Sequence, residues 1–177
     1  VRDGNLFVTT IADRKERQVT QGASETVNWG VAEFVAQEEM DRSTGHWWAH
    51  DDAHIAVARV DESGVGIVNR AAIGAEGTKI YPQRYPAAGT PNAVVELYVI
   101  KPHGSGRVKV DLGPNSDIYL ARVNWSPDGK LLYVQRESRD QKRLDLLRVD
   151  PATGAAQVVL SETARTWINL SNVFRVL

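Results

Sequence analysis

The sequence has no cysteine among its 177 residues. Disulfide bonds, thiolate metal sites and a cysteine nucleophile are therefore excluded. No apolar run approaches the roughly 18 residues that a membrane-spanning helix needs, and no basic segment followed by an apolar signal core stands at the N-terminus. Because a chain without cysteine suits a reducing or an oxidising compartment equally, composition leaves the location open.

An excess of charge of either sign is also missing. Lys and Arg number 21 against 22 Asp and Glu, the formal net charge is −1, and no long run of one sign occurs. Nucleic acids and anionic lipid surfaces attract strongly basic patches, so neither is expected as a partner. The 42% hydrophobic content is sufficient for a globular core of ordinary domain size.

Sustained helical periodicity is scarce, and short alternating or β-branched runs dominate instead. Turn residues such as Ser126-Pro127-Asp128-Gly129 and Pro151-Ala152-Thr153-Gly154 separate these runs. The pattern predicts an all-β chain of short strands joined by hairpins. The predicted strands are Leu6–Ile11, Ile55–Val60, Val94–Ile100, Ile118–Trp125, Leu131–Arg136, Leu144–Val149 and Ala156–Leu160.

An internal repeat distinguishes among all-β folds. The segment Trp48–Arg59 aligns without gaps onto Trp125–Arg136, at an offset of 77 residues, and Leu6–Gln18 resembles Leu144–Gln157 with one extra residue in the later turn. A repeated set of four short strands is typical of a β-propeller, whose blades have about 40 to 45 residues. The identical positions of the first pair are Trp48 and Trp125, Asp51 and Asp128, Val57 and Val134, and Arg59 and Arg136.

The 77-residue offset exceeds one blade by roughly 30 residues. Residues 69–92 supply most of this excess, and their Pro-rich second half cannot be a central strand, so a projecting arm is predicted there. The predicted fold is therefore all-β: part of a β-propeller, with about three four-stranded antiparallel blades, one short helix and the arm.

The two ends predict that residues 1–177 are an excised part of a propeller domain. The sequence begins at Val1 without an initiator methionine, and Phe174–Leu177 has the apolar alternation of a strand interior. A ring needs at least four blades, so about three blades would leave the sheet assembly open.

The one predicted helix covers residues 31–42, which contain good helix formers and no proline. Val31, Phe34 and Val35 have the spacing of a buried stripe, and Glu38 and Glu39 follow one turn later at its edge. Two interpretations are open. The glutamates are solvated surface charges, or their mutual repulsion is relieved by a bound cation such as the α-ammonium of a peptide.

Several segments, taken in order, resemble the dipeptidyl peptidase IV family. They resemble in particular the propeller domain of bacterial members of this branch of the prolyl oligopeptidase superfamily, and His50 departs from the family by standing where proline is usual. The segments are Gly30–Glu39, Trp47-Trp48, Tyr85–Asn92 with the strand after it, Val123–Asp128 and Thr166–Leu170.

The resemblance implies an N-terminal propeller that caps a C-terminal α/β-hydrolase domain, in a serine exopeptidase that releases Xaa-Pro or Xaa-Ala dipeptides. By the same resemblance, Glu38 and Glu39 bind the substrate's N-terminal amine, and the protein is periplasmic or secreted. The resemblance also implies that the arm takes part in a homodimer; the alternative is an arm that folds back over its own blade. The alternative is a non-enzymatic propeller that serves as a protein-interaction module, with Glu38 and Glu39 as surface charges only.

No catalytic residue is expected within this chain. It has no G-x-S-x-G nucleophile elbow, so the serine nucleophile and its Asp and His partners would belong to a hydrolase domain absent from these residues, and the chain alone should be inactive. No cofactor is predicted. His50 and His54 are four residues apart, but they flank a turn at Asp51, so no metal site is predicted either. Asp51 and Asp128 are expected to accept local backbone hydrogen bonds.

Overall fold

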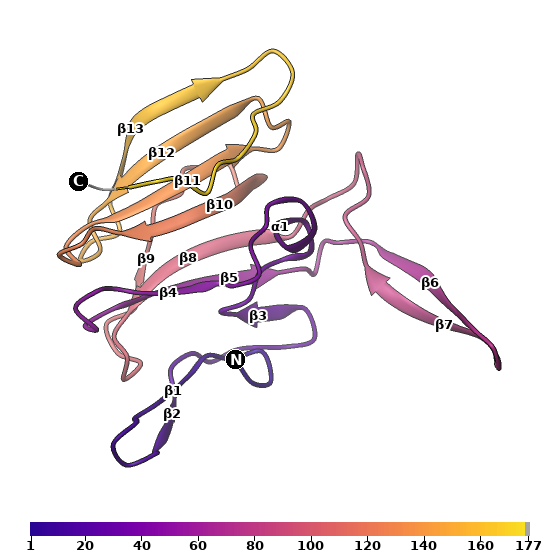
Figure 1. Cartoon of the computed structure of the whole chain (residues 1–177), viewed down its shortest axis with the longest axis horizontal. Helices are drawn as coiled ribbons and strands as arrows, with labels where there is room; N and C mark the ends of the chain where they lie inside the picture. Colours follow the sequence, from indigo (N-terminus) through magenta and orange to yellow (C-terminus); the bar gives the residue numbers. More distant parts are fainter. Residues whose placement is uncertain (176–177) are drawn as a thin grey trace.

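The computed structural model describes residues 1–175; Val176 and Leu177, the end of the strand-like alternation noted above, lie outside the described residues. Antiparallel sheets and one short helix, α1 (Phe34–Glu39), make up the fold, so the all-β prediction is confirmed (Figure 1). The strands are β1 (Phe7–Thr9), β2 (Glu16–Gln18), β3 (Val27–Trp29), β4 (His46–Trp48), β5 (Ile55–Asp61), β6 (Ile67–Gly74), β7 (Gly77–Arg84), β8 (Val94–Ile100), β9 (Val108–Lys109), β10 (Ile118–Trp125), β11 (Leu132–Ser138), β12 (Arg143–Val149) and β13 (Ala156–Thr163).

Strands β10 to β13 form a four-stranded antiparallel meander, the shape of one propeller blade. Its first hairpin turns at Ser126–Gly129, where Gly129 has a φ of +69° and the Asp128 carboxylate accepts a hydrogen bond from the Lys130 amide at 3.1 Å. The Asp51 carboxylate accepts from the Ala53 amide at 2.9 Å in the matching turn. Both aspartates are thus local backbone acceptors, as predicted.

The second blade has an interrupted first strand. Strands β3 and β4 pair with opposite ends of β5, which pairs on its other side with β8, and β8 pairs with β9. Trp48 lies opposite Ile55 in this blade, and Trp125 lies opposite Leu132 in the other. Because both residues of the pair shift by the same 77 positions, the sequence repeat is a repeat of blade structure.

The hairpin β1–β2 has the same register as the β12–β13 hairpin at a constant offset of 140 residues, since Thr9 lies opposite Glu16 as Val149 lies opposite Ala156. The alignment of Leu6–Gln18 onto Leu144–Gln157 was therefore wrong in its register, and the later turn has no extra residue. Residues 1–175 therefore hold two complete four-stranded blades and one hairpin, where about three blades were predicted. The sheets lie one upon another, with β1–β2 below, β3–β5–β8 between and β10–β13 above (Figure 1).

The arm is the hairpin β6–β7, inserted between β5 and β8 within the second blade, and it extends away from the stacked sheets (Figure 1). It spans Ile67–Arg84 and is followed by an irregular segment, whereas the sequence predicted an arm over 69–92. Pro82 has no amide hydrogen to donate, but it is tolerated because β7 pairs with β6 alone and is not a central strand of a sheet.

The core lies between the stacked sheets rather than under one of them. In β5, Ile55 and Val57 face the β1–β2 hairpin, while Ala56, Ala58 and Val60 face the β10–β13 blade, and all five are at most 1% exposed. A strand covered on both faces needs apolar residues at every position instead of alternate ones. This explains the continuous apolar run of β5.

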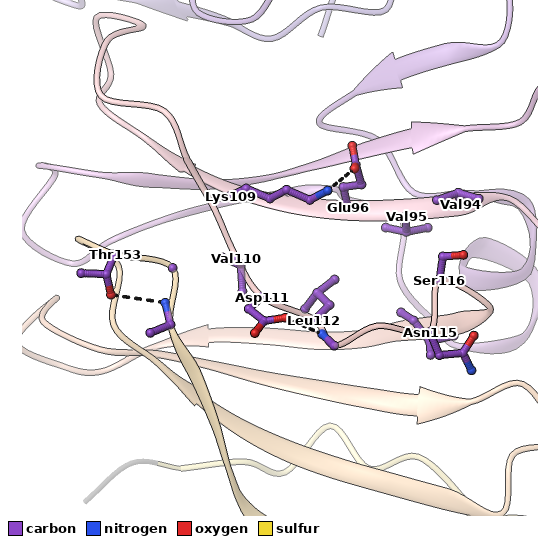
Figure 2. A pocket seen from close by; sticks show the side chains of 14 residues that line it. Val94, Val95, Glu96, Lys109, Val110, Asp111, Leu112, Asn115, Ser116 and Thr153 are labelled. Carbon is purple, nitrogen blue, oxygen red and sulfur yellow. Dashed lines mark hydrogen bonds and ion pairs between the residues drawn. The ribbon is translucent and has the colours of Figure 1, made fainter.

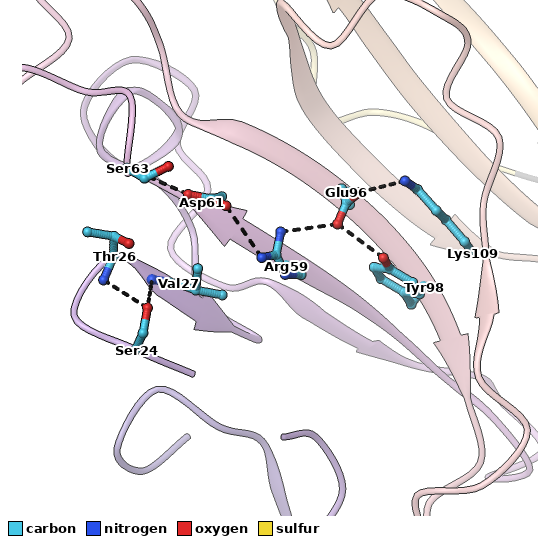
Figure 3. A network of polar contacts seen from close by, with 9 residues as sticks. All are labelled: Ser24, Thr26, Val27, Arg59, Asp61, Ser63, Glu96, Tyr98 and Lys109. Carbon is cyan, nitrogen blue, oxygen red and sulfur yellow. Dashed lines mark hydrogen bonds and ion pairs between the residues drawn. The ribbon is translucent and has the colours of Figure 1, made fainter. Parts of the chain in front are cut away.

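The arginine common to both repeats has a structural role. Arg59 faces the β1–β2 side of its blade and pairs with Glu96, its cross-strand partner, at 3.2 Å, within a network that includes Asp61, Tyr98 and Lys109 (Figure 3). The equivalent Arg136 pairs at 2.6 Å with its own cross-strand partner, Asp145. Each blade thus places an arginine on its second strand and an acid on its third.

Helix α1 lies within an excursion that leaves and re-enters the first strand of its blade. Gly30 ends the first part with a φ of +72°, Gly45 begins the second part, and Val31 and Thr44 bridge the base of the excursion. A Cβ on Gly45 would lie 2.1 Å from the carbonyl oxygen of Val31, so no residue larger than glycine fits without displacing the backbone.

We predict that Gly45→Ala lowers the free energy of unfolding by about 1 to 3 kcal/mol, because the added methyl group collides with backbone rather than with a flexible side chain. The control is Gly64→Ala, since no atom lies within 4 Å of the Cβ position there. Urea denaturation of both variants measures the effect. Equal unfolding midpoints for the two would contradict the geometry at the base of the excursion.

Candidate functional site

The helix that carries the two predicted site residues is shorter than predicted. It covers Phe34–Glu39 rather than 31–42, because the residues on either side return to the sheet. Its buried stripe is also shifted: Ala32, Ala36 and Met40 are the buried residues, packing against Tyr119 of β10. The predicted stripe of Val31, Phe34 and Val35 was wrong, since these residues are only half-buried. Contact with the neighbouring blade, which local spacing cannot reveal, selects the buried face.

A buried ion pair joins the two ends of the helical excursion. The Glu33 carboxylate, at the N-cap position, accepts a hydrogen bond from the Arg42 guanidinium at 2.6 Å, and the two side chains are 2% and 4% exposed. Arg42 also donates to the Thr44 carbonyl at 2.8 Å and lies over the Trp47 ring. Sequence reasoning missed this pair. The sequence gives only one indication of this ion pair: a glutamate just before the helix and an arginine shortly after it.

Glu38 and Glu39 are both exposed and adjacent at the C-terminal end of α1. Successive helical side chains point about 100° apart, and accordingly Glu38 lines a hollow with Arg70 and Gln83 of the arm, while Glu39 lines a cavity against the β10–β13 blade. Within residues 1–175 neither carboxylate forms a hydrogen bond or an ion pair. Both carboxylates are therefore free to receive a cation.

The base of the arm packs directly against the helix. The Phe34 ring meets the Tyr85 ring edge-on with centroids 5.1 Å apart. Arg84 donates to the carbonyls of Glu62 and Val65, at 3.2 Å and 2.9 Å. Phe34 and Arg84 both line the hollow beside Glu38, so these contacts fix the base of the arm against the helix at that hollow.

The cavity beside the exposed Glu39 has a volume of about 420 Å³ and is also lined by a buried acid, Glu137. Glu137 of β11 is 2% exposed, and burial raises its pKa to about 7, although the charge of Arg122 partly offsets this effect. Arg122 donates from Nε to the Asn172 side-chain oxygen at 2.8 Å, and the Asn172 amide donates to Asp41 at 3.1 Å. Burial lowers the pKa of Arg122. Sequence reasoning did not single out Glu137 or Arg122.

A more apolar cavity of about 440 Å³ lies elsewhere, lined by β8, β9, the segment between β9 and β10, and the β12–β13 turn (Figure 2). Its charged side chains already have partners: Lys109 donates to Glu96, and Asp111 accepts from the Gly113 amide at 2.8 Å. In the part of the chain that the structure describes, no group of three His, Cys, Asp or Glu side chains is arranged to hold a metal, and His54 stacks against Trp125. We therefore centre the candidate site on α1.

The arrangement is suited to binding a cationic ligand rather than to catalysing the cleavage of a bond. Two adjacent carboxylates without partners attract a positive group, and charge-assisted hydrogen bonds to an ammonium are short and strong. The carboxylates flank two hollows, so a ligand held there has space on both sides. The nucleophile elbow sequence G-x-S-x-G is absent, as noted above.

Comparison with known proteins gives consistent matches over more than nine tenths of the chain. A family model described as "Dipeptidyl peptidase IV (DPP IV) N-terminal region" matches residues 1–177. The crystal structure of Porphyromonas gingivalis dipeptidyl peptidase 4 is similar over 94% of this chain, with a TM-score of 0.85 and 25% sequence identity.

Two curated relatives have similar levels of identity. Human dipeptidyl peptidase 8 is 26% identical over 99% of this chain, and a protein of Ajellomyces capsulatus described as probable dipeptidyl-aminopeptidase B is 28% identical over 91%. The matched region is 25% of the human protein, 19% of the fungal protein and 24% of the bacterial structure. The chain thus spans a quarter or less of the length of these relatives.

We predict that Arg42→Met lowers the free energy of unfolding by about 3 to 5 kcal/mol, because it leaves the Glu33 carboxylate buried without its partner. The double variant Glu33→Gln with Arg42→Met should recover part of that loss. Lys15→Met, which removes an exposed ion pair with Asp13, is the control and should cost at most about 1 kcal/mol. The account of the pair would be wrong if Arg42→Met and Lys15→Met unfolded at the same urea concentration.

Proposed function

Since this chain belongs to the dipeptidyl peptidase IV N-terminal region family, we propose that it is the part of a serine exopeptidase that holds the N-terminal amine of the substrate. In this proposal Glu38 and Glu39 bind the α-ammonium of the substrate peptide. A hydrolase domain elsewhere in the full-length protein cleaves that peptide after its second residue. The products are Xaa-Pro and Xaa-Ala dipeptides. The observation that carries the proposal is the pair of adjacent, unpartnered carboxylates on α1.

The electrostatics of the pair favour an ammonium ligand. Two ionised carboxylates on neighbouring residues repel each other, and an ammonium between them removes the repulsion while donating hydrogen bonds to both. A peptide α-ammonium has three N–H donors on one atom, so it can bond both carboxylates at once. An internal peptide segment has no such group and gains nothing from the site.

The position of the helix supports the same role. The excursion places α1 beside β10, the first strand of the neighbouring blade, and the Glu33–Arg42 pair keeps its two ends together. A rigid anchor fixes the distance from the amine to the point of cleavage, and holding one end of a substrate in a defined geometry is worth several orders of magnitude in rate. An interaction module, the alternative role, has no need for such an anchor on an inserted helix.

We further propose that the arm contributes to a two-fold homodimer of the full-length enzyme. Ile73 at its tip is 84% exposed, and Ile67, Ile80 and Tyr81 are 45% to 62% exposed, so the hairpin presents apolar side chains to solvent. Exposed apolar surface of this kind marks interaction sites. The base of the arm, by contrast, packs on Phe34 of the helix.

In the full-length protein, Glu38→Gln and Glu39→Gln should each lower kcat/KM for an Ala-Pro 4-nitroanilide by about 30-fold to several thousand-fold. Loss of one partner of a desolvated charge pair costs about 2 to 5 kcal/mol, which sets this range. Glu162→Gln removes an exposed carboxylate from β13 and is the matched control. Wild-type kinetics in both helix variants would overturn the proposed function.

Replacing residues 71–80 by Asn-Gly should convert the full-length dimer to a monomer, measured by light scattering at micromolar concentration. The replacement joins Arg70 to Tyr81, a register pair, through a two-residue turn and leaves Arg84 and Tyr85 in place. The control replaces only the turn residues Ala75 and Glu76 by Asn-Gly and should remain dimeric. A shortened arm that still gives the mass of a dimer would refute the arm's role.

A further inference from the structure

The cavity beside Glu39 is built from three separate parts of the chain. Arg122 comes from β10, Glu137 from β11, and Trp167, Asn169 and other residues from the segment after β13, which turns back across this sheet (Figure 1). Ile168 in that segment is 5% exposed and donates its amide hydrogen to the Gln141 carbonyl at 2.8 Å. The segment is therefore packed onto the blade and forms a true wall of the cavity.

Glu137 has no partner to explain its burial. Its side chain is 2% exposed, its Oε1 atom is fully buried, and within residues 1–175 neither oxygen accepts a hydrogen bond or forms an ion pair. A buried carboxyl without a partner costs free energy, and most buried polar groups in folded proteins are bonded. An unpaired acid that lines a cavity is therefore available to a ligand that enters it.

The charges around Glu137 leave the cavity negative on balance. The charged residues that line it are Arg122 from β10, Glu39 from the end of α1, Asp41 just after the helix, and Glu137 itself; Tyr119 of β10 lies opposite Glu137 in register. The lining residues of the segment after β13 and of the β11–β12 turn are uncharged. Asn172 binds both Asp41 and Arg122, and Arg122 also donates to the Ala121 carbonyl at 2.8 Å. These contacts occupy Arg122 and Asp41, and they leave Glu137 free.

We propose that this cavity receives the side chain of the substrate's first residue and that Glu137 makes it selective for a basic side chain, lysine or arginine. The proposal rests on the proposed function, in which Glu38 and Glu39 hold the α-ammonium. The side chain of the first residue branches from the carbon that carries this ammonium. Glu39 lines the cavity, so the branch enters it beside the anchor, and a terminal ammonium or guanidinium reaches the buried acid while Trp167 covers the aliphatic stem.

The test compares two 4-nitroanilide substrates, Lys-Pro and norleucine-Pro, on the full-length enzyme; their first residues have the same carbon skeleton, and norleucine lacks only the terminal ammonium. Their kcat/KM ratio isolates the terminal charge, because the anchor, the proline and the chemistry are common to both. The wild-type ratio should favour lysine about tenfold or more, the worth of a charged hydrogen bond to a buried group. It should fall as the pH is lowered from about 8 to about 6, because protonation of a carboxyl with a pKa of about 7 removes the negative charge.

Glu137→Gln should bring the ratio close to one and abolish its pH dependence, whereas Glu137→Asp should retain part of both. Glu137→Leu, a second variant without the charge, should give the same ratio as Glu137→Gln. Glu162→Gln, which removes a carboxylate of the same blade from outside the cavity, should keep the wild-type ratio.

A ratio that is unchanged in Glu137→Gln and Glu137→Leu would overturn the inference. So would a wild-type enzyme that shows no preference for lysine over norleucine. These failures differ from failure of the proposed function, which would appear as wild-type turnover of both substrates in Glu38→Gln and Glu39→Gln. If those two variants lose activity while the Glu137 variants keep the lysine preference, the anchor stands and the selectivity does not.

Discussion

The two backbone hydrogen bonds of Ala58 hold the base of the helical excursion. Its amide donates to the Gly45 carbonyl at 2.7 Å, and its carbonyl accepts from the Gly30 amide at 2.9 Å, so one buried residue of β5 joins both ends of the interruption. The ladder of the blade therefore continues across an insertion that contains a whole helix. The position of the Glu33–Arg42 pair and of the two exposed glutamates depends on these two hydrogen bonds, because they fix both ends of the excursion.

The other blade shows why the insertion is tolerated at that place. Strand β10 has a β-bulge between Leu120 and Arg122, and Leu120 pairs with Arg136 as Trp29 pairs with the equivalent Arg59. The bulge and the helical excursion thus occupy the same point in their blades. A bulge already interrupts pairing and redirects the chain, so added residues there disturb few ladder hydrogen bonds. The first strand of a blade has one free edge, which gives the excursion room.

The regular alternation of apolar and polar residues made most of the long strands predictable from the sequence. The features that were not predicted depend on contacts between blades. Strands Val94–Ile100 and Ile118–Trp125 have the predicted bounds, because their apolar runs are long and end at turn residues. The three-residue strands β3 and β4 were not predicted, since so few residues carry no period. Glu38 and Glu39 were singled out from their helix spacing and from the resemblance, but Glu137 was not, because the cavity that it lines is completed by a segment some 30 residues further along the chain.

The central claim is that the glutamate pair on α1 recognises a free peptide amine. The most direct measurement is the kcat/KM of the full-length enzyme for an Ala-Pro 4-nitroanilide and for the same compound acetylated at its nitrogen, in the wild type and in the double variant Glu38→Gln with Glu39→Gln. The wild type should prefer the free amine by about a hundredfold or more, and the double variant should lose most of this preference. Equal turnover of both compounds by the wild type would contradict the claim.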